Sequence, residues 1–301
     1  MKCTRCGSPG AEVSLPSHNA GFCRECFFVY LPRQVERCIR HFRMFERTDR
    51  ILVCISGGKD SLVLWDILLS LGYEADGLHI DQGIGDYSRD SRAKTERFAA
   101  ARERLLHRVE LVEEGMEIPA VRSRLHQNAC SLCGTVKRHH FNHAAAQLGY
   151  EVVATGHNLD DEASRLLGNL LQWNRDYIER QYPVLESTTS GMVRKVKPLV
   201  RVSEYETTCY ALLKGIDYMM LECPYSKGAN TLVYKEALNA IEERIPSTKA
   251  RFLFGFFAER QEADRTPSQS SEDEAWNRCA RCGQPSFRNL CRYCLIKDQM
   301  R

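Results

Sequence analysis

The chain has 301 residues, of which 43% are hydrophobic and 27% are charged. This composition is typical of a globular protein and argues against extensive disorder, and the length suggests about two domains of ~150 residues each. No apolar run approaches the roughly 20 residues that a membrane-spanning helix needs, and the start lacks the apolar stretch of a secretory signal. We therefore expect a soluble cytoplasmic protein with no membrane partner.

Charge is distributed unevenly along the chain. Residues 1–50 carry nine Lys and Arg against five Asp and Glu, residues 277–301 carry six against one, and residues 51–276 carry 27 against 33. Two basic ends therefore flank an acidic body, although the net charge is only +3. Basic clusters of this kind suit a polyanionic partner, while a simple solvated surface explains them equally well.

Cysteine is unusually frequent, with fourteen in the chain. Ten of the cysteines form five C-x2-C pairs, which are Cys3/Cys6, Cys23/Cys26, Cys130/Cys133, Cys279/Cys282 and Cys291/Cys294. In a long chain without a signal peptide, such pairs indicate metal binding rather than disulfides. Cys38, Cys54 and Cys209 lie in apolar or helical contexts, and we predict them to be small core residues.

Each end of the chain carries two of these pairs. Four thiolates from two C-x2-C pairs are the donor set of a closed, tetrahedral structural zinc site. The predicted ligands are Cys3, Cys6, Cys23 and Cys26 in one module and Cys279, Cys282, Cys291 and Cys294 in the other. His18 could compete as a ligand in the first module, although Cys26 is favoured. The neighbouring arginines suit RNA phosphates, with a zinc-stapled protein–protein module as the alternative.

Between the two modules, apolar runs alternate with helical patterns. A basic amphipathic helix is predicted within residues 27–46, with Pro32 in its first turn. The predicted strands lie at 51–55, 77–80, 109–112 and 151–155, and the predicted helices at 62–71, 91–106, 133–148, 160–172, 203–214 and 231–244. This order predicts an α/β fold with a doubly wound parallel sheet covered on both faces.

The same patterns predict the domain boundaries. Residues 1–46 form the first zinc module with its linking helix, and residues 47–261 form the α/β body. Residues 262–275 are polar and acidic and are predicted to be a linker. Residues 276–301 form the second zinc module.

Residues 56–61, with the sequence SGGKDS, follow a predicted strand and open a helix. The glycines Gly57 and Gly58 let the backbone come close to a ligand, and the free amides with the hydroxyls of Ser56 and Ser61 form a phosphate seat. Lys59 adds a positive charge, and Asp60 could hold Mg²⁺. An ordinary glycine-rich turn is the alternative, and the spacing is not that of a Walker A loop. The six residues match the PP-loop of the ATP pyrophosphatases, which cleave ATP between the α and β phosphates.

A second segment of interest, residues 78–81 (LHID), lies at the predicted end of another strand. Doubly wound sheets bind nucleotides at the ends of their strands. His79 and Ile80 are therefore candidate nucleotide contacts.

A third segment, residues 155–162 (TGHNLDDE), also lies at a predicted strand end. Gly156 allows close approach to a nucleotide, and His157 is a further candidate contact. The carboxylates that follow lie at a helix start, where the helix dipole stabilises negative charge. Capping explains one of them, and Asp161 is the candidate for metal binding or catalysis.

The pair Cys130 and Cys133 has no second pair nearby, and Cys223 is the plausible third ligand. Three thiolates could hold a [4Fe–4S] cluster with one open iron, and a reactive dithiol is an alternative. Zinc completed by water, His139 or His140 is another. Lys137 lies one helical turn after Cys133, so both can face one pocket, where its charge would stabilise phosphate or an oxyanion.

Together, these motifs resemble the tRNA 2-thiouridine synthetases of the TtuA type, over nearly the whole chain. The matching segments are the terminal C-x2-C pairs with SGGKDSL, GLHID, ACSLCGTVKRH, ATGHNLDDEA, VRKVKPL, ECPYSKGA and YKEALN. TtcA-type thiolases share the PP-loop and the cluster cysteines but lack the paired terminal modules. Relatives often have His as the fourth ligand of the first zinc module, where this chain has Cys26.

The resemblance implies a PP-loop fold of the HUP-like class that binds ATP with Mg²⁺ and adenylates the C2 oxygen of a tRNA uridine. A [4Fe–4S] cluster on Cys130, Cys133 and Cys223 would present sulfide, and Asp60, Lys137 and Asp161 would be the catalytic residues. Uridine 54 is the expected target and uridine 34 the alternative.

The resemblance also implies partners. The sulfur would arrive as a thiocarboxylate on a small ubiquitin-like carrier, and a homodimer is possible. Two other functions stay open from the sequence: thiolation or desulfuration of a small heterocycle by the same chemistry, and a non-enzymatic zinc RNA-binding protein.

Overall fold

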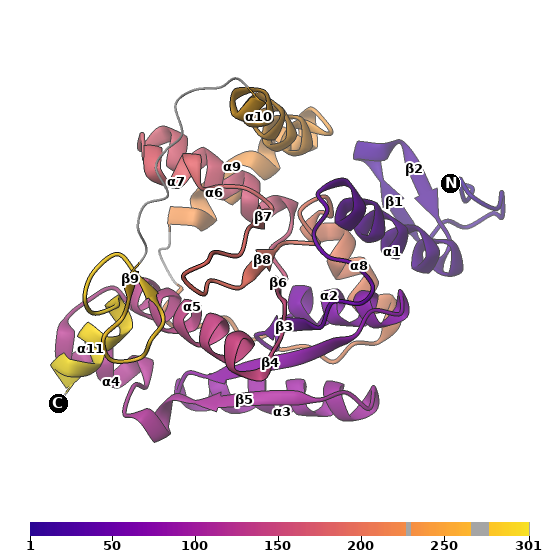
Figure 1. Ribbon diagram of the computed structural model, residues 1–301. Helices are drawn as coiled ribbons and strands as arrows, with labels where there is room; N and C mark the ends of the chain where they lie inside the picture. Colours follow the sequence, from indigo (N-terminus) through magenta and orange to yellow (C-terminus); the bar gives the residue numbers. More distant parts are fainter. Residues whose placement is uncertain (227–229, 266–276, 301) are drawn as a thin grey trace.

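The computed structural model describes residues 1–226, 230–265 and 277–300, arranged around one six-stranded sheet (Figure 1). The strand order is β5-β4-β3-β6-β8-β7. Five strands are parallel, namely β3 (Ile51–Ile55), β4 (Ala75–Asp81), β5 (Leu106–Glu110), β6 (Val152–Thr155) and β8 (Arg194–Val196). The predicted doubly wound sheet is confirmed. Two of its strands were not predicted, β8 and the edge strand β7 (Val184–Leu185), and β7 runs antiparallel to β8 because a short loop joins them.

The central strand β3 is buried on both faces, as its unbroken apolar sequence requires. Ile51, Val53 and Ile55 pack with α2 (Lys59–Ser70) and α3 (Gly85–Ala101) on one face. Leu52 and Cys54 pack with α5 (Ala129–Leu148) on the other face. The carboxyl ends of β3 and β6 therefore open between the two helical layers, where the PP-loop and residues 155–162 begin.

The linking helix α1 (Arg24–His41) starts earlier than predicted and contains Pro32 in its interior. Proline lacks the N–H that would bond the carbonyl of Phe28. The helix nevertheless continues, because residues on both sides of Pro32 are fully buried in the main core, among them Phe27, Leu31 and Val35. Burial of these side chains outweighs one missing hydrogen bond.

Several element bounds differ from the prediction. The predicted strand at 109–112 is instead β5 (Leu106–Glu110) followed by the 3-10 helix η2 (Leu111–Glu114), and the helix before it is α3, which ends at Ala101. The strand β5 lies at the edge of the sheet and is half-buried, so its sequence is too polar to stand out. The predictions of α6 (Leu159–Leu171), α8 (Glu204–Lys214) and α9 (Asn230–Arg244) are confirmed within a residue or two.

Four α-helices of the described residues were not predicted: α4 (Ile118–Leu125), α7 (Arg175–Glu179), α10 (Thr248–Arg265) and α11 (Arg292–Met300). The helix α10 includes the first four residues of the segment 262–275, which the sequence predicts to be a linker. The rest of that segment lies outside the described residues.

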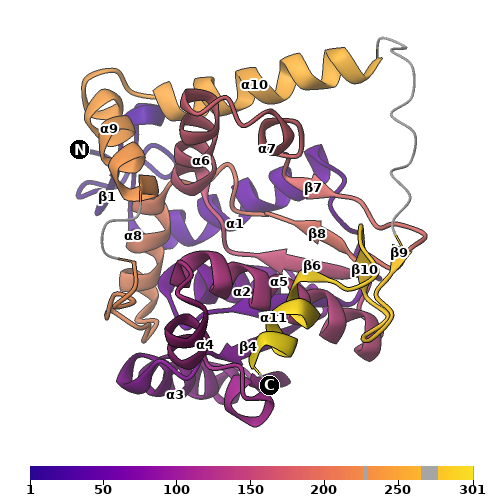
Figure 2. The ribbon, with the colours of Figure 1, turned by 90° about the vertical axis from the view of Figure 1, so that its left-hand side faces the viewer.

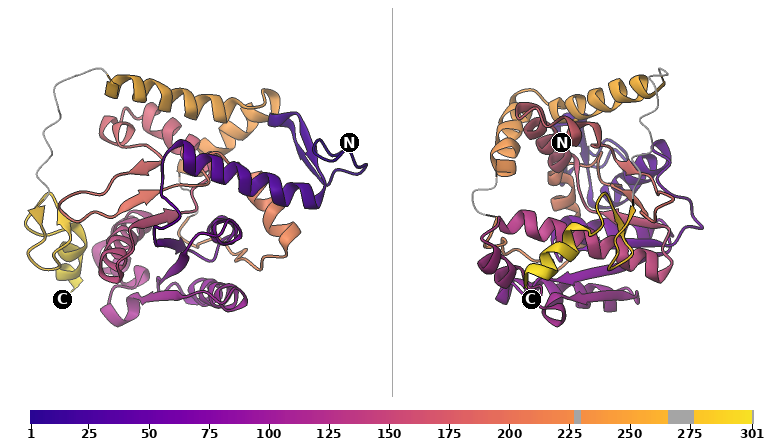
Figure 3. Two further views of the ribbon diagram at one scale, coloured as in Figure 1. Left: turned by 45° about the vertical axis from the view of Figure 1, so that its right-hand side comes forward. Right: turned by 60° about the vertical axis from the view of Figure 1, so that its left-hand side comes forward.

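The two terminal modules lie at opposite ends of the molecule (Figures 1 and 3). The N-terminal module consists of β1 (Val13–Leu15), η1 (Pro16–His18), β2 (Ala20–Phe22) and the start of α1. The C-terminal module consists of β9 (Asn277–Arg278), β10 (Pro285–Ser286) and α11 (Arg292–Met300), and α11 packs against α5 and α4 (Figure 2). Within the described residues, no helix combines the length and apolar character needed to span a bilayer.

Candidate functional site

A cavity of about 270 Å³ opens where β3 and β6 end. It brings together three parts of the chain that are distant in sequence: the PP-loop, the turn of α5 that follows Cys133, and the segment after β6. Its lining residues are Cys54, Ser56, Gly58, Asp60, Ser61, Lys137, Phe141, Thr155, Gly156, His157 and Asp161. The structure therefore places all three predicted catalytic residues, Asp60, Lys137 and Asp161, on one cavity.

The PP-loop backbone depends on its glycines. Gly57 has a φ of +78°, and a Cβ there would lie 2.8 Å from the Ser91 hydroxyl. Gly58 is the N-cap residue of α2, and the Ser61 hydroxyl donates to its carbonyl oxygen at 2.9 Å. A Cβ on Gly156 would lie 2.9 Å from the Ser61 amide nitrogen, so only glycine lets the β6 loop approach the PP-loop this closely. These contacts leave a backbone cradle of the kind that binds phosphate at a helix start.

Lys59 forms two ion pairs and does not line the cavity. Its Nζ donates to Asp60 Oδ2 at 3.0 Å and to Glu204 Oε1 at 2.7 Å. Burial alone would lower the pKa of Lys59, but Asp60 and Glu204 outweigh it and hold the pKa above its usual value. Burial raises the pKa of Asp60, partly opposed by Lys59 and by the Thr207 hydroxyl that donates to it.

The three carboxylates at the start of α6 have different partners. Asp160 is buried, accepts from Lys249 Nζ and accepts the Glu204 amide at 2.8 Å. Glu162 is also fully buried and accepts from Lys197 Nζ at 2.7 Å. Asp161 caps its own helix through Asn158, yet its other oxygen, Oδ1, accepts from Lys235 Nζ at 2.9 Å beside the cavity. Asp161 is therefore the carboxylate of the three that faces the PP-loop.

The predicted nucleotide contacts His79, Ile80 and His157 do not all lie at the cavity. His157 lines the cavity, and its Nδ1 lies 2.9 Å from the Thr155 hydroxyl. Burial lowers the pKa of His157 to about 4, so its ring is neutral near pH 7. His79 and Ile80 are buried and do not line this cavity. His79 Nδ1 is 3.0 Å from the carbonyl of Ile55, the last residue before the PP-loop, and its Nε2 has no hydrogen-bond partner among the residues that the structure describes.

Cys130, Cys133 and Cys223 share one neighbourhood beside the cavity. Cys130 Sγ lies 3.5 Å from the carbonyl oxygen of Tyr225, two residues after Cys223. Cys133 Sγ lies 3.0 Å from Gln82 Oε1, and Cys133 and Cys223 pack against the same hydrophobic cluster. Burial raises the pKa of Cys130, and the neighbouring Cys223 and Cys133 raise it further.

These three sulfurs are spaced more widely than the ligands of a single ion. Within the part of the chain that the structure describes, two groups of at least three ligand atoms lie within 4.8 Å of one another, and neither contains Cys130. A single zinc ion needs such a group, whereas a cubane cluster separates its ligands because each binds a different iron. The alternative ligands for zinc lie elsewhere: His139 stacks on Tyr293 at 4.0 Å, and His140 Nε2 is 3.6 Å from Glu114 Oε1.

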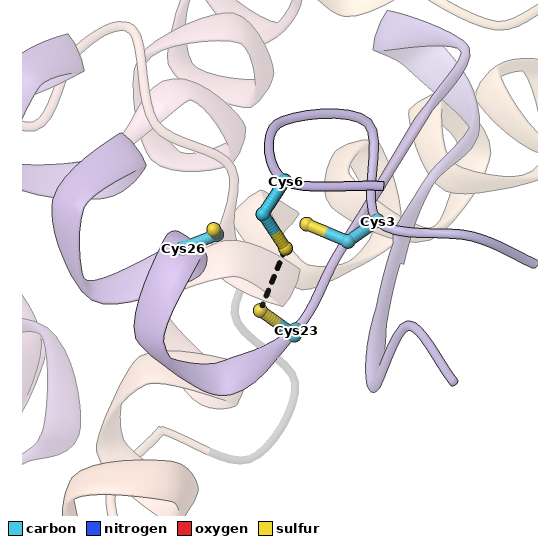
Figure 4. Close-up of side chains that lie close together, drawn as sticks. All are labelled: Cys3, Cys6, Cys23 and Cys26. Carbon is cyan, nitrogen blue, oxygen red and sulfur yellow. Dashed lines mark hydrogen bonds between the residues drawn. The ribbon is translucent and has the colours of Figure 1, made fainter. Parts of the chain in front are cut away.

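The two groups with close ligand atoms are the predicted zinc sites. They are Cys3, Cys6, Cys23 and Cys26 (Figure 4), and Cys279, Cys282, Cys291 and Cys294. Zn–S bonds of about 2.3 Å in a tetrahedron place the sulfurs about 3.8 Å apart. The Cys6–Cys23 distance is 3.8 Å and the Cys282–Cys291 distance is 3.7 Å, so both sets fit zinc.

His18, the predicted competitor of Cys26, is not part of the first group of four sulfurs. It lines a separate cavity of about 870 Å³ between the N-terminal module, α8, α9 and α10. This cavity is the larger of the two, yet apart from His18 it contains none of the residues predicted for nucleotide binding, catalysis or metal binding.

Sequence reasoning missed four residues of the site. Glu204 and Thr207 from α8 and Lys235 from α9 contact the PP-loop or Asp161, and Gln82 follows β4 and contacts Cys133. The order of helices along the chain does not reveal that α8 and α9 reach the site. Gln82 comes directly after the LHID segment, which was the available signal.

The architecture and this cavity define a PP-loop ATP-binding protein. The PP-loop domain matches residues 31–223, and the N-terminal LIM domain of the 2-thiouridine synthetase TtuA matches residues 2–28. The tRNA-5-methyluridine(54) 2-sulfurtransferase of Thermus thermophilus is 44% identical over 99% of this chain and 91% of its own length. The protein of the same name from Thermotoga maritima is 39% identical over 100% of this chain and 97% of its own length. The chain belongs to this family of 2-thiouridine synthetases, and it is therefore a transferase of the PP-loop class.

More distant proteins are similar over most of the chain. Cytoplasmic tRNA 2-thiolation protein 1 of Saccharomyces cerevisiae is 28% identical over 98% of this chain and 85% of its own length. The U34-tRNA thiolase NcsA from Methanococcus maripaludis, solved with its [4Fe–4S] cluster, superposes with a TM-score of 0.77 at 23% identity, covering 87% of this chain and 88% of NcsA. At this identity the structural likeness supports the fold.

Proposed function

We propose that this chain is an ATP-dependent tRNA uridine 2-sulfurtransferase that acts on uridine 54. The observation that carries the proposal is that one cavity joins the PP-loop, Lys137 and Asp161, while Cys133 lies one helical turn before Lys137 on α5. The helix α5 thus carries two of the three cysteines and, one turn further on, a lysine that lines the cavity of the phosphate seat. The target position follows the names of the bacterial relatives.

The residues of the cavity fit ATP and a divalent cation. The PP-loop amides and the hydroxyls of Ser56 and Ser61 would bind phosphate, and the carboxylates of Asp60 and Asp161 would hold Mg²⁺ on it. The uridine C2 oxygen would bond to the α-phosphorus as the bond to the β-phosphate breaks, so that pyrophosphate leaves. Sulfur would then bond to C2, and AMP would leave with the original oxygen.

The three cysteines fit an iron–sulfur cluster. Cys130, Cys133 and Cys223 are spaced too widely for one ion, and they supply three of the four ligands that a [4Fe–4S] cluster takes. When bound, such a cluster supplies an iron without a protein ligand, which can hold hydrosulfide. Lys137, between the cysteines and the phosphate seat, would stabilise negative charge on the oxygen that departs.

The remaining partners follow from the family resemblance. Each terminal module would hold one structural zinc ion, and their exposed arginines would bind tRNA phosphates. A ubiquitin-like carrier with a C-terminal thiocarboxylate would deliver sulfur, and a homodimer is possible. The tRNA substrate and the names of the yeast relatives favour a cytoplasmic location.

The test is sulfuration of tRNA by the protein reconstituted with iron and sulfide under anaerobic conditions. With ATP and sulfide, mass spectrometry of the nucleosides should detect 2-thiouridine in tRNA with a uridine at position 54, and none when that base is replaced. Cys130→Ser should abolish the product and the cluster absorbance, whereas Cys209→Ser, a thiol on α8 away from the cavity, should keep both. A protein that binds no iron would overturn the proposal. A protein that sulfurates only position 34 would overturn the proposed target.

A further inference from the structure

Glu204 holds Lys59 and Lys235, and each of these lysines also bonds a carboxylate that lines the PP-loop cavity, Asp60 or Asp161. Glu204 Oε1 accepts from Lys59 Nζ at 2.7 Å, and Glu204 Oε2 accepts from Lys235 Nζ at 2.7 Å. Burial would raise the pKa of Glu204, but the bonds from Lys235 and Lys59 lower it to about 2. The single negative charge of Glu204 therefore neutralises only part of the positive charge on the two adjacent ammonium groups.

Lys235 reaches this position from α9, beyond residues 31–223 that match the PP-loop domain. Its Nζ also donates to Asp161 Oδ1 at 2.9 Å. Burial would lower its pKa, but Asp161 and Glu204 outweigh burial and keep the pKa above its usual value. Lys235 is therefore a permanent cation, one carboxylate away from the PP-loop lysine.

The packing of α9 on α6 fixes this position. A Cβ on Gly168 of α6 would lie 2.7 Å from the Tyr234 ring, so the glycine allows α9 to approach closely. The Tyr234 hydroxyl accepts from Gln172 Nε2 at 3.2 Å. The residue next to Tyr234 in sequence, Lys235, is thereby held against the start of α6, where Asp161 lies.

We propose that Lys235 is a second phosphate-binding lysine, which acts on the β and γ phosphates of ATP, and that Glu204 occupies the phosphate position when the nucleotide is absent. This inference rests on the proposed function of the PP-loop. A polyphosphate is a better partner for the two ammonium groups than a single carboxylate is. The phosphate oxygens carry more negative charge, and they can bind both groups at once. When ATP binds, phosphate oxygens replace Glu204 between Lys59 and Lys235, and Asp60 and Asp161 become free to bind Mg²⁺.

The proposal predicts opposite effects for the two partners. Lys235→Ala should raise the Kd for ATP with Mg²⁺ at least about tenfold, since one charge-assisted contact is lost. Glu204→Gln should lower this Kd several-fold, because the competing carboxylate is removed. Neither variant should change the Kd for AMP by more than about twofold, since AMP lacks the phosphates concerned.

Isothermal titration of the full chain with ATP and with AMP, without tRNA, separates the outcomes. Arg244→Ala, an exposed residue on the same helix, is the control and should leave both Kd values unchanged. Equal weakening of ATP and AMP by Lys235→Ala would show a structural role only, and weaker ATP binding in Glu204→Gln would make Glu204 a Mg²⁺ ligand; either result overturns the proposal. A wild-type chain that binds no ATP would instead contradict the PP-loop function itself.

Discussion

At the scale of single residues, three carboxylates that are neighbours in sequence have different environments in the structure. Asp160, Asp161 and Glu162 are consecutive, yet Asp160 and Glu162 are buried against Lys249 and Lys197. Each of these buried carboxylates already has its charge balanced by a lysine, so neither is well placed for chemistry, although removing the lysine would leave a costly unpaired charge. Asp161 alone of the three lines the PP-loop cavity, which Lys137 of a different helix also lines.

This arrangement predicts that the reaction needs both residues, Lys137 to stabilise negative charge and Asp161 to hold Mg²⁺ on the phosphates. Lys137→Ala and Asp161→Asn should each lower the rate of tRNA thiolation at least about 100-fold, since each removes a charge near the transferring groups. ATP binding should persist in Lys137→Ala, because the backbone amides of the PP-loop remain in place, whereas Asp161→Asn should also weaken the binding of ATP with Mg²⁺. Single-turnover thiolation and ATP titration check both effects.

The control for this prediction is Gln147→Ala, which changes an exposed side chain on the same helix as Lys137. It should keep the wild-type rate. If Lys137→Ala retains more than about a tenth of the rate, Lys137 does not stabilise the transition state.

The buried pair of Glu162 and Lys197 supports a prediction about stability. Lys197→Met should lower the free energy of unfolding by about 3–5 kcal/mol, because it leaves a buried carboxylate without its partner. Arg165, whose guanidinium is 3.8 Å from Glu162 and half-exposed, should contribute no more than about 1 kcal/mol. Urea unfolding of Lys197→Met and Arg165→Ala compares the two, and equal losses would contradict this ranking.

At the scale of elements, the sequence predicted what is local and missed what depends on packing. The strand β3, the PP-loop and the start of α2 form one continuous signal of apolar strand, glycine pair and helix. Glu204 and Lys235 carry no such signal of their place in the fold, although Lys235 lies in the matching segment YKEALN. They lie 145 residues from Lys59 and 74 residues from Asp161 respectively, and the packing of α8 and α9 alone brings them to the site.

The cysteines show the same difference between what is local in sequence and what depends on packing. The sequence predicted which four sulfurs lie together in each terminal module, because each pair supplies two cysteines from one short turn. For the middle site, the sequence provided the residues but not their separation. The spacing of Cys130, Cys133 and Cys223, which disfavours a single zinc ion, depends on where the segment before α9 meets α5.

The docking of α11 on α5 is predicted to weaken in acid. Burial, His140 and His143 lower the pKa of His139 to about 3, and its ring stacks on Tyr293 of α11. In the unfolded chain the pKa of a histidine is about 6.5. Below that pH the imidazole of His139 binds a proton in the unfolded chain but stays neutral in the folded protein. Stability is therefore lost progressively from about pH 6.5 towards pH 3.

The measurement is urea unfolding at about pH 7.5 and about pH 5.5. His139→Phe keeps the ring stack without a titrating group, so its loss of stability between these conditions should be smaller than that of the wild type by up to about 1.4 kcal/mol. The control is His126→Asn, since His126 is exposed and has a positive φ that asparagine tolerates. The same acid loss in His139→Phe and the wild type would exclude His139 as the cause.

At the scale of the whole molecule, two basic modules lie at opposite ends of an acidic body (Figure 3). The C-terminal module is fixed to α5, the helix that carries Cys130, Cys133 and Lys137, through Tyr293 and Gln284. A polyanion bound to this module would therefore be held in a defined position relative to the cavity. The N-terminal module is fixed separately, through the buried face of α1.

We expect the arginines of the C-terminal module to supply part of the affinity for tRNA. Arg278 and Arg288 are exposed, and replacing both with Glu should weaken tRNA binding at least about tenfold at physiological salt. The slope of log Kd against log salt should fall by about one for each lost phosphate contact. ATP binding should be unchanged, since neither residue lines the PP-loop cavity.

The matched control reverses two exposed arginines of the acidic body, Arg104 and Arg244, which changes the net charge by the same amount. Filter binding or fluorescence anisotropy at several salt concentrations distinguishes the two cases. If the modules position tRNA, the control retains most of the affinity and the wild-type slope, because phosphate contacts require charge at the right place rather than a particular total. Equal losses in both pairs would mean that tRNA responds to net charge alone, and the modules would then be protein-binding or purely structural elements.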